Sequence, residues 1–118
     1  MENSVRFIRL SGYYEKMGLL RDVQRLLNGH RYFSDKDIQW IEFIQRLKET
    51  GMPLEQIRRY ADLRAQGDST MSARQRLLEA HAKALQKNIA RQQRHLKKLG
   101  EKIAFYQSAM DRKKKHLT

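Results

Sequence analysis

The chain has 118 residues, no cysteine and a formal net charge of +12. The absence of cysteine excludes disulfides, thiol catalysis, thiol-based sensing and Cys-bound metals. This length allows one small head and one elongated element. No apolar run approaches the ~20 residues of a membrane span, and the N-terminal MENSVRFIRL lacks the features of a signal peptide. A cytoplasmic location away from membranes is therefore expected.

The positive charge is concentrated in the C-terminal half. Residues 1–68 hold 12 Lys and Arg against 10 Asp and Glu, whereas residues 69–118 hold 13 against 3. An excess of basic residues indicates a polyanionic partner such as nucleic acid. A basic face on a long helix is ordinarily a solvated surface, and the alternative is a nonspecific nucleic-acid or acidic-partner surface carried by Arg91, Arg94, Lys97 and Lys98.

The N-terminal half reads as short elements. Residues 4–17 predict a short helix with Phe7, Leu10 and Tyr14 on one side, and Gly18 supplies its stop. Asn28-Gly29 is a hairpin signal, because both residues tolerate a positive φ, so a small two-stranded wing is expected around it.

Two further helices follow the wing. Ser34 is expected to cap the first one, with Asp35 and Asp37 in its first turn, and Gly51 to end it. Pro53 begins the second helix, which runs to Gly67. Asp68, Ser69 or Thr70 can cap the helix that comes next. Trp40 is interpreted as a packing residue.

A long helix dominates the second half of the chain. Its seam recurs in alternating steps of 4 and 3 residues, at Leu78, Ala82, Leu85, Ile89, Gln92, Leu96, Leu99, Ile103, Tyr106 and Met110. This is the a and d pattern of a coiled coil. A helix of roughly 50 Å cannot bury such a seam against so short a chain, so a second copy is the natural partner.

These elements predict a mainly α fold with three segments. Residues 1–68 form a winged head, residues 69–110 a coiled-coil dimerisation helix and residues 111–118 a basic flexible tail. The dimerisation residues are Leu78, Leu85, Ile89, Gln92, Leu96, Leu99, Ile103 and Tyr106. Gln92 either sets the register of the coil or lies at a hydrated point of the seam.

Four stretches carry a resemblance to a known family: GYYEKMGLL at 12–20, NGHRYFSDKD at 28–37, IEFIQRLKETGMPLEQI at 41–57 and the long coil. Together they resemble the MerR family of bacterial transcription regulators over residues 10 to 110. The spacing and the Gly67-Asp68 junction are most similar to its short, aldehyde- or nitrosative-stress-responsive branch.

The resemblance implies a homodimer of winged helix-turn-helix heads joined by an antiparallel coiled coil. Such dimers bind a pseudo-palindromic operator inside a promoter spacer and distort the DNA, where RNA polymerase is a further partner. By this resemblance the first helix contacts double-stranded DNA through Tyr13, Tyr14 and Lys16, and the wing does so through Arg25, Arg31 and Tyr32. Tyr14 shares a face with Phe7 and Leu10, so a core role is equally open for it.

The chain also departs from the family pattern. Only twelve residues precede Tyr13, and they do not contain the first helix and turn of the motif, so the helix-turn-helix is expected to be shortened. Gly12 stands where the family has Arg. The alternative function is therefore a truncated dimerisation protein that pairs with a full-length relative and does not bind DNA specifically by itself.

No other chemistry is indicated. The four histidines, at 30, 81, 95 and 116, show neither pairing nor carboxylate clustering, so no metal site or cofactor is expected. The sequence contains no nucleophile motif, paired carboxylates or phosphate-binding loop, so no catalytic residue is proposed and an enzyme is not expected.

Overall fold

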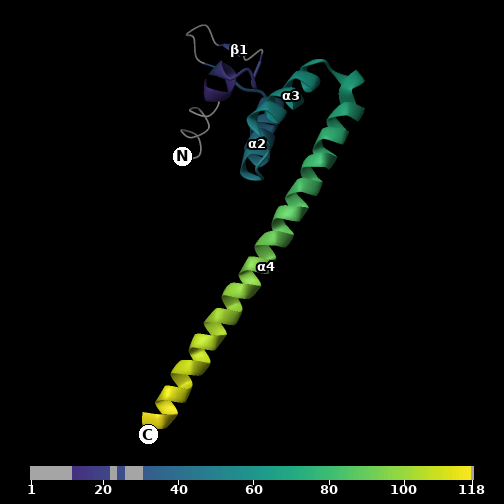
Figure 1. The fold of residues 1–118 in the computed structure, drawn as a ribbon. Helices are drawn as coiled ribbons and strands as arrows, with labels where there is room; N and C mark the ends of the chain where they lie inside the picture. Colours follow the sequence, from purple (N-terminus) through teal and green to yellow (C-terminus); the bar gives the residue numbers. More distant parts are fainter. Residues whose placement is uncertain (1–11, 22–23, 26–30, 118) are drawn as a thin grey trace. The chain divides into compact units, whose positions relative to one another are not determined.

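The protein is described by a computed structural model over residues 12–21, 24–25 and 31–117. The chain divides into two compact units, Met1–His81 and Ala82–Thr118, which we name the head unit and the rod unit. Helix α4, Met71–Leu117, begins in the head unit and continues through the rod unit (Figure 1). Residue 68, where the predicted head ends, is the first residue of the turn that precedes α4.

The head unit combines short strands with helices. Residues 12–16 are helical. Strands β1, Gln24–Arg25, and β2, Arg31–Tyr32, form an antiparallel pair in which Arg25 lies opposite Arg31. Helices α2, Asp35–Glu49, and α3, Leu54–Ala65, follow, and the single turn η1, Asp68–Thr70, precedes α4. The predicted mainly α fold class is confirmed, and the two strands occur where the wing was predicted.

Hydrogen bonds between residues close in the sequence fix both ends of α2. The Ser34 hydroxyl accepts a hydrogen bond from the Asp37 amide at 3.2 Å, and the Asp37 carboxylate accepts from the Ser34 amide at 3.0 Å. This capping box satisfies amides that the first helical turn leaves without partners, and it confirms Ser34 as the predicted cap. At the other end Gly51 has φ +86°, and the Met52 amide donates to the Leu47 carbonyl at 2.9 Å. This is a Schellman turn, which favours glycine at the left-handed position.

Hydrogen bonds from two side chains hold the turn between α3 and α4. The Thr70 hydroxyl donates to the Leu63 carbonyl at 2.5 Å and lies 2.8 Å from the Gly67 carbonyl. Arg74 donates to the same Thr70 hydroxyl at 3.1 Å and to the Gly67 carbonyl at 3.2 Å. Thr70, one of the three predicted caps of the long helix, thus donates its hydroxyl hydrogen bonds to carbonyl groups that precede it in the chain, near the end of α3.

The core of the head unit gathers side chains from every helix of that unit. Its buried members are Tyr14, Leu19, Leu20, Trp40, Ile41, Ile44, Leu47, Met52, Ile57 and Ala61. Leu77 and Leu78 of α4 pack against this cluster and are partly buried. Because apolar burial is the main driving force of folding, this cluster holds residues 12–20 onto α2 and α3.

Helix α4 extends to Leu117, past the end at Met110 that the seam predicted. The flexible tail expected at residues 111–118 is therefore helical through Leu117. Two local features favour helix here. Residues 111–117 contain no Gly or Pro, and the last turn carries Lys114, Lys115 and His116, whose positive charges are favourable at a helix C-terminus.

Candidate nucleic-acid interface

The helical segment 12–16 is the element that the sequence assigned to DNA contact. It ends in a Schellman turn at Gly18, whose φ is +78°. The Leu19 amide donates to the Tyr14 carbonyl at 2.8 Å, and the Gly18 amide donates to the Glu15 carbonyl at 3.1 Å. Leu19 and Leu20 then enter the core, each 2% exposed. Through this turn the chain passes from the helix 12–16 into the core of the head unit.

The two tyrosines of this helix have different environments. Tyr14 is 1% exposed and belongs to the core, whereas Tyr13 is 47% exposed. Lys16 is exposed as well. A side chain as buried as Tyr14 offers no surface to a ligand, so the DNA contact expected of it is not retained, and its role is packing. Tyr13 and Lys16 stay available for the predicted contact.

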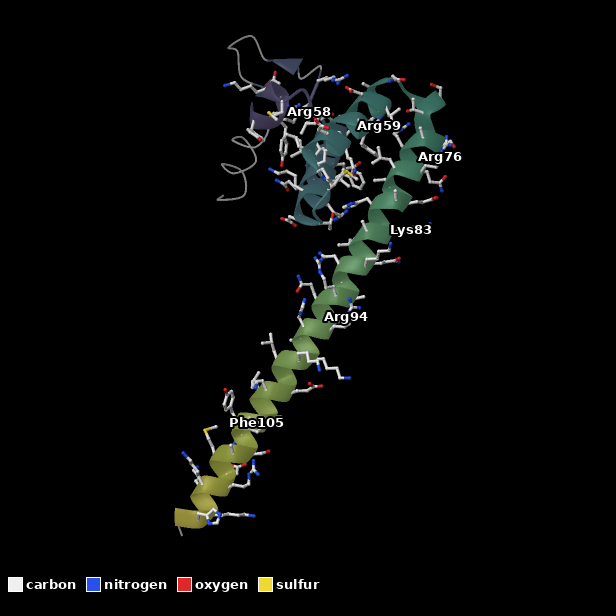
Figure 2. The ribbon with its side chains drawn as sticks, viewed as in Figure 1. Arg58, Arg59, Arg76, Lys83, Arg94 and Phe105 are labelled. Atoms are coloured by element: carbon white, nitrogen blue, oxygen red, sulfur yellow. The ribbon has the colours of Figure 1, made fainter. Side chains whose placement is uncertain are left out.

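Two cations from other helices lie beside the same segment. The Lys48 ammonium of α2 lies 5.4 Å from the centroid of the Tyr13 ring and 5.7 Å from that of Tyr14. An ammonium over an aromatic face is attracted by the ring quadrupole. Arg58 of α3 reaches the same region, with one guanidinium nitrogen 3.9 Å from the sulfur of Met17. Figure 2 labels Arg58 in the head unit.

Sequence reasoning missed Lys48 and Arg58 as interface candidates. They lie more than thirty residues from Tyr13 along the chain, and only the packing of α2 and α3 brings them to it. The available signal was weak: Lys48 lies in the last turn of α2, where a cation is already explained by the helix dipole.

The wing contributes through its backbone register. Arg25 lies opposite Arg31, and Gln24 lies opposite Tyr32, so the three wing residues predicted to contact DNA fall on two paired strands. The predicted turn at Asn28-Gly29 and the apolar residues Phe7 and Leu10 lie outside the described residues.

An aromatic cluster with one arginine lies on α2 and α3 of the head unit. The ring centroids of Trp40 and Tyr60 are 5.6 Å apart and nearly parallel, and Phe43 completes the group. The Arg64 guanidinium lies 4.4 Å from the centroid of the Trp40 ring. Burial lowers the pKa of Arg64 from its usual value, although an arginine remains charged under any ordinary condition. This arrangement is explained by packing, as was predicted for Trp40.

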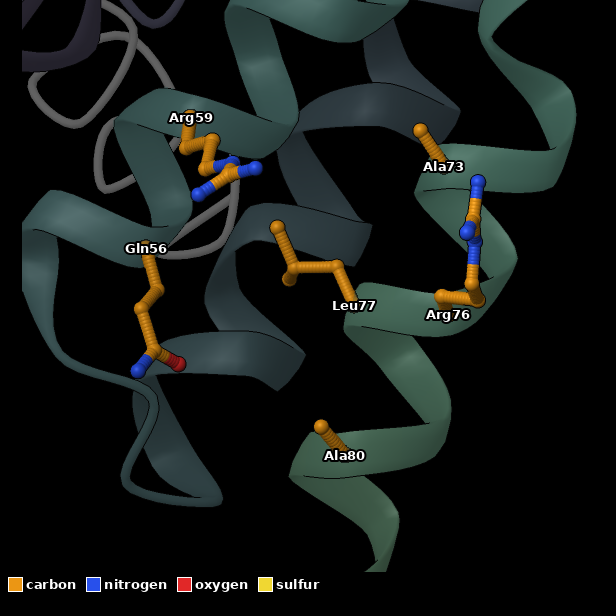
Figure 3. Close-up of a pocket in the computed structure, with 6 residues that line it drawn as sticks. All are labelled: Gln56, Arg59, Ala73, Arg76, Leu77 and Ala80. Atoms are coloured by element: carbon orange, nitrogen blue, oxygen red, sulfur yellow. The ribbon is translucent and has the colours of Figure 1, made fainter.

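A shallow hollow of about 480 Å³ lies between α3 and the first part of α4 (Figure 3). Its sides carry Gln56 and Arg59 from α3 and Arg76 from α4, and Leu77 with Ala73 and Ala80 supplies the apolar surface. The residues that line it provide neither a carboxylate nor a nucleophile. Among the described residues no three His, Asp or Glu side chains gather into a metal-binding group.

The predicted seam begins in the head unit and continues along the rod unit. Leu78 packs against the head core, whereas Ile89 is 47% exposed and Ile103 is 69% exposed in the single chain. The other seam residues of the rod unit are also largely exposed: Leu96, Leu99, Tyr106 and Met110, with Gln92. Leu85 is half-buried. A seam of this kind, apolar except at Gln92, is what a helical partner covers.

Within the described part of the chain, no helix is long and apolar enough to cross a membrane.

Comparison with known proteins identifies relatives of this arrangement. The family model for MerR HTH family regulatory proteins matches residues 6–63, and the MerR DNA-binding model matches residues 38–102. An HTH-type transcriptional regulator of Haemophilus influenzae is 44% identical over 97 residues, which cover 82% of this chain and 72% of that protein.

Solved structures agree with these matches. HiNmlR, a MerR family regulator that lacks the sensor domain and is bound to promoter DNA in its crystal structure, is 44% identical with a TM-score of 0.73. That match covers 82% of this chain and 77% of HiNmlR. A MerR family transcriptional regulator from Listeria monocytogenes is 30% identical with a TM-score of 0.82, over 95% of this chain and 83% of that one. Family models, relatives and solved structures thus agree with the helices and wing described above, and the chain belongs to the MerR family of helix-turn-helix transcriptional regulators.

Proposed function

We propose that this protein is a DNA-binding transcriptional regulator that acts as a homodimer on a pseudo-palindromic promoter operator and distorts the spacer DNA. The observation that carries the proposal is the group of four side chains at the helix 12–16. Tyr13 and Lys16 are exposed on it, and Lys48 and Arg58 reach it from α2 and α3.

The chemistry of this group suits a phosphate backbone. Lysine and arginine bind phosphate through charge-assisted hydrogen bonds, and a tyrosine hydroxyl can donate to a phosphate oxygen from a rigid ring. Lys48 is also a positioning residue, since its contact with Tyr13 holds that ring. Arg25, Arg31 and Tyr32 of the wing are proposed to extend the contact to neighbouring phosphates.

The relatives support this assignment. HiNmlR, whose structure covers most of this chain, is bound to promoter DNA. The region 38–102 matches the MerR DNA-binding model. Because two proteins of 44% identity share their backbone geometry closely, the corresponding surface of this chain is the natural candidate for the same ligand class.

The seam on α4 supports the dimer. Two copies related by a two-fold axis would present two heads to two half-sites, and the palindromy of an operator mirrors such symmetry. DNA that must bend or untwist to meet both heads would be read partly through its deformability. RNA polymerase at the same promoter would then encounter the distorted spacer.

A mobility-shift titration tests the proposal. The probes are duplex DNA from the promoter region beside the gene and a random duplex of equal length, each at two salt concentrations. We expect Arg58→Gln to weaken binding and to lower the salt slope by about two, because each of the two heads of the dimer loses one phosphate contact. Arg59→Gln is the matched control, because this neighbouring cation lines the hollow beside Ala73 and Leu77 instead. Equal affinity of the unmodified protein for both duplexes would contradict specific regulation.

A second candidate function is pairing with a longer relative through the same seam. The nearly neutral balance of residues 1–68, with 12 basic against 10 acidic residues, favours it. Native mass spectrometry of this chain mixed with a full-length relative distinguishes the two functions: heterodimers support pairing, and exclusive homodimers contradict it.

A further inference from the structure

A row of six cations follows the rod unit: Lys83, Lys87, Arg91, Arg94, Lys98 and Lys102. We name this row the basic ridge. Successive members are separated by four, four, three, four and four residues, and helical neighbours three or four apart lie on the same side of a helix. The side chains of all six are exposed, and Figure 2 labels Lys83 and Arg94 among them.

The basic ridge and the seam lie on different sides of α4. When Ala82, Ile89 and Leu96 occupy the a positions of the heptads, the six cations occupy b, c, f and g positions. Five of these are b, c or f positions, which face solvent in a coiled coil while a and d face the partner helix. A partner helix on the seam would therefore leave the ridge accessible.

The charge of the ridge is almost uncompensated. Glu101 is the only acidic residue between positions 82 and 110. Its carboxylate lies 3.5 Å from the Lys98 ammonium, and this is the one ion pair that any ridge member makes within the described residues. Arg91 donates instead to the neutral side chain of Asn88 at 2.7 Å.

The spacing makes the cations repel one another. Lys83 and Lys87 are an i, i+4 pair of like charge, and so are Lys87 with Arg91, Arg94 with Lys98, and Lys98 with Lys102. Like charges at this spacing destabilise a helix. A polyanion along the ridge would remove this repulsion.

We propose that the basic ridge binds the phosphate backbone of duplex DNA, independently of base sequence, as a second DNA contact apart from the head unit. The ridge extends over about 29 Å at 1.5 Å per residue, close to one turn of duplex. Duplex DNA offers an almost continuous line of negative charge along its axis. A straight helix with a cation every three or four residues matches that line.

An acidic protein segment is the less suitable ligand. Protein–protein interfaces are enriched in aromatic anchors and depleted in lysine, whereas four of the six ridge members are lysine. Aromatic rings lie only at the C-terminal end of the ridge, where the Lys102 ammonium is 5.6 Å from the centroid of the Phe105 ring and 5.9 Å from that of Tyr106. The ridge therefore has the composition of a phosphate-binding surface.

The test compares two quadruple variants of the full chain. The first, K87Q/R91Q/R94Q/K98Q, removes four ridge charges. The second, K87R/R91K/R94K/K98R, keeps all four charges and serves as the matched control. Binding to a random duplex is followed by fluorescence anisotropy over a series of salt concentrations, so the result does not depend on operator recognition by the head unit.

We expect the neutral variant to lose about tenfold or more in affinity for random duplex at low salt and its salt slope to fall by about three to four. The charge-keeping variant should bind like the unmodified protein. Circular dichroism and sedimentation must show that both variants stay helical and keep the same oligomeric state.

Two results would overturn the proposal. One is a neutral variant that binds random duplex with an unchanged salt slope. The other comes from a parallel titration with polyglutamate: a neutral variant that no longer binds polyglutamate but still binds random duplex would assign the ridge to an acidic protein partner. The proposed function fails separately, because it is tested by the preference of the unmodified protein for promoter duplex over random duplex, and the ridge variants are compared on random duplex alone.

Discussion

The indole N–H of Trp40 donates a hydrogen bond to the carbonyl oxygen of Leu19 at 2.7 Å, inside the core of the head unit. This bond joins α2 to the segment that follows the helix 12–16. The indole thereby satisfies a carbonyl group that the Schellman turn carries into an apolar environment, and the turn and the core depend on each other.

Trp40→Phe should therefore destabilise the head unit more than the change in volume alone suggests. The Leu19 carbonyl would stay buried without its donor, which costs about 1–3 kcal/mol. Urea denaturation followed by circular dichroism measures the free energy of unfolding. Gln39→Ala, at the exposed neighbouring position, should change that free energy by less than about 0.5 kcal/mol. Similar losses in both variants would show that the hydrogen bond contributes nothing specific.

A negative charge at two adjacent aromatic residues of α4 should affect dimerisation differently. Tyr106 and Phe105 are each 56% exposed, but only Tyr106 occupies a seam position. Tyr106→Asp should weaken dimerisation by about 2–4 kcal/mol, because a seam carboxylate would be buried or would hold the helices apart. Phe105→Asp should leave the dimer intact. Sedimentation equilibrium measures both, and dissociation caused by Phe105→Asp alone would place the interface on another face.

The orientation of the proposed coil can be tested with engineered cysteines, since the chain has none of its own. The series of 4- and 3-residue steps along the seam is identical in both chain directions. Two antiparallel copies can therefore pair every seam residue of one helix with a seam residue of the other, and in that register Ala82 faces Tyr106 of the second copy. Mixing Ala82→Cys with Tyr106→Cys under mild oxidation should give a disulfide-linked heterodimer. A parallel coil would instead cross-link each variant to itself, and gel electrophoresis separates the two outcomes.

Two glycines should respond to alanine with opposite sign. Gly51 has φ +86°, so Gly51→Ala should cost about 1–2 kcal/mol even though no atom lies within 4 Å of the added methyl. Gly100 lies inside α4 with equally open space, and Gly100→Ala should stabilise the helix by about 1 kcal/mol. Thermal melting at a fixed protein concentration measures both. A lower midpoint for Gly100→Ala would mean that the rod needs flexibility or close approach at that position.

The parts of the fold that depend on local sequence could be predicted. Ser34 and Asp37 are three residues apart and make their capping box without help from the rest of the chain, so the local sequence indicated the start of α2. The Asn28-Gly29 dipeptide indicated the strands around it for the same reason. The long helix followed from the period of the seam.

The candidate site depended on tertiary contacts, and these could not be read from the sequence. Tyr14 was left open between core and interface because a tyrosine suits both, and its burial is decided by α2 and α3. Lys48 and Arg58 reach the helix 12–16 only because those two helices cross beside it. The helical state of residues 111–117 was missed because the prediction ended the helix with the seam at Met110 and gave too little weight to the favourable dipole and the absence of helix breakers.

The turn at Thr70 is held by hydrogen bonds between polar groups, and none of these groups belongs to the apolar core of the head unit. The apolar cluster that stabilises the head contains none of the atoms that tie η1 to the end of α3, which are a hydroxyl, two carbonyls and a guanidinium. The direction in which the chain leaves α3 is therefore fixed by a few hydrogen bonds together with the packing of Leu77 and Leu78 of α4 against the core. A change at the Thr70 hydroxyl would thus act on the turn between α3 and α4 without removing any side chain from the apolar cluster.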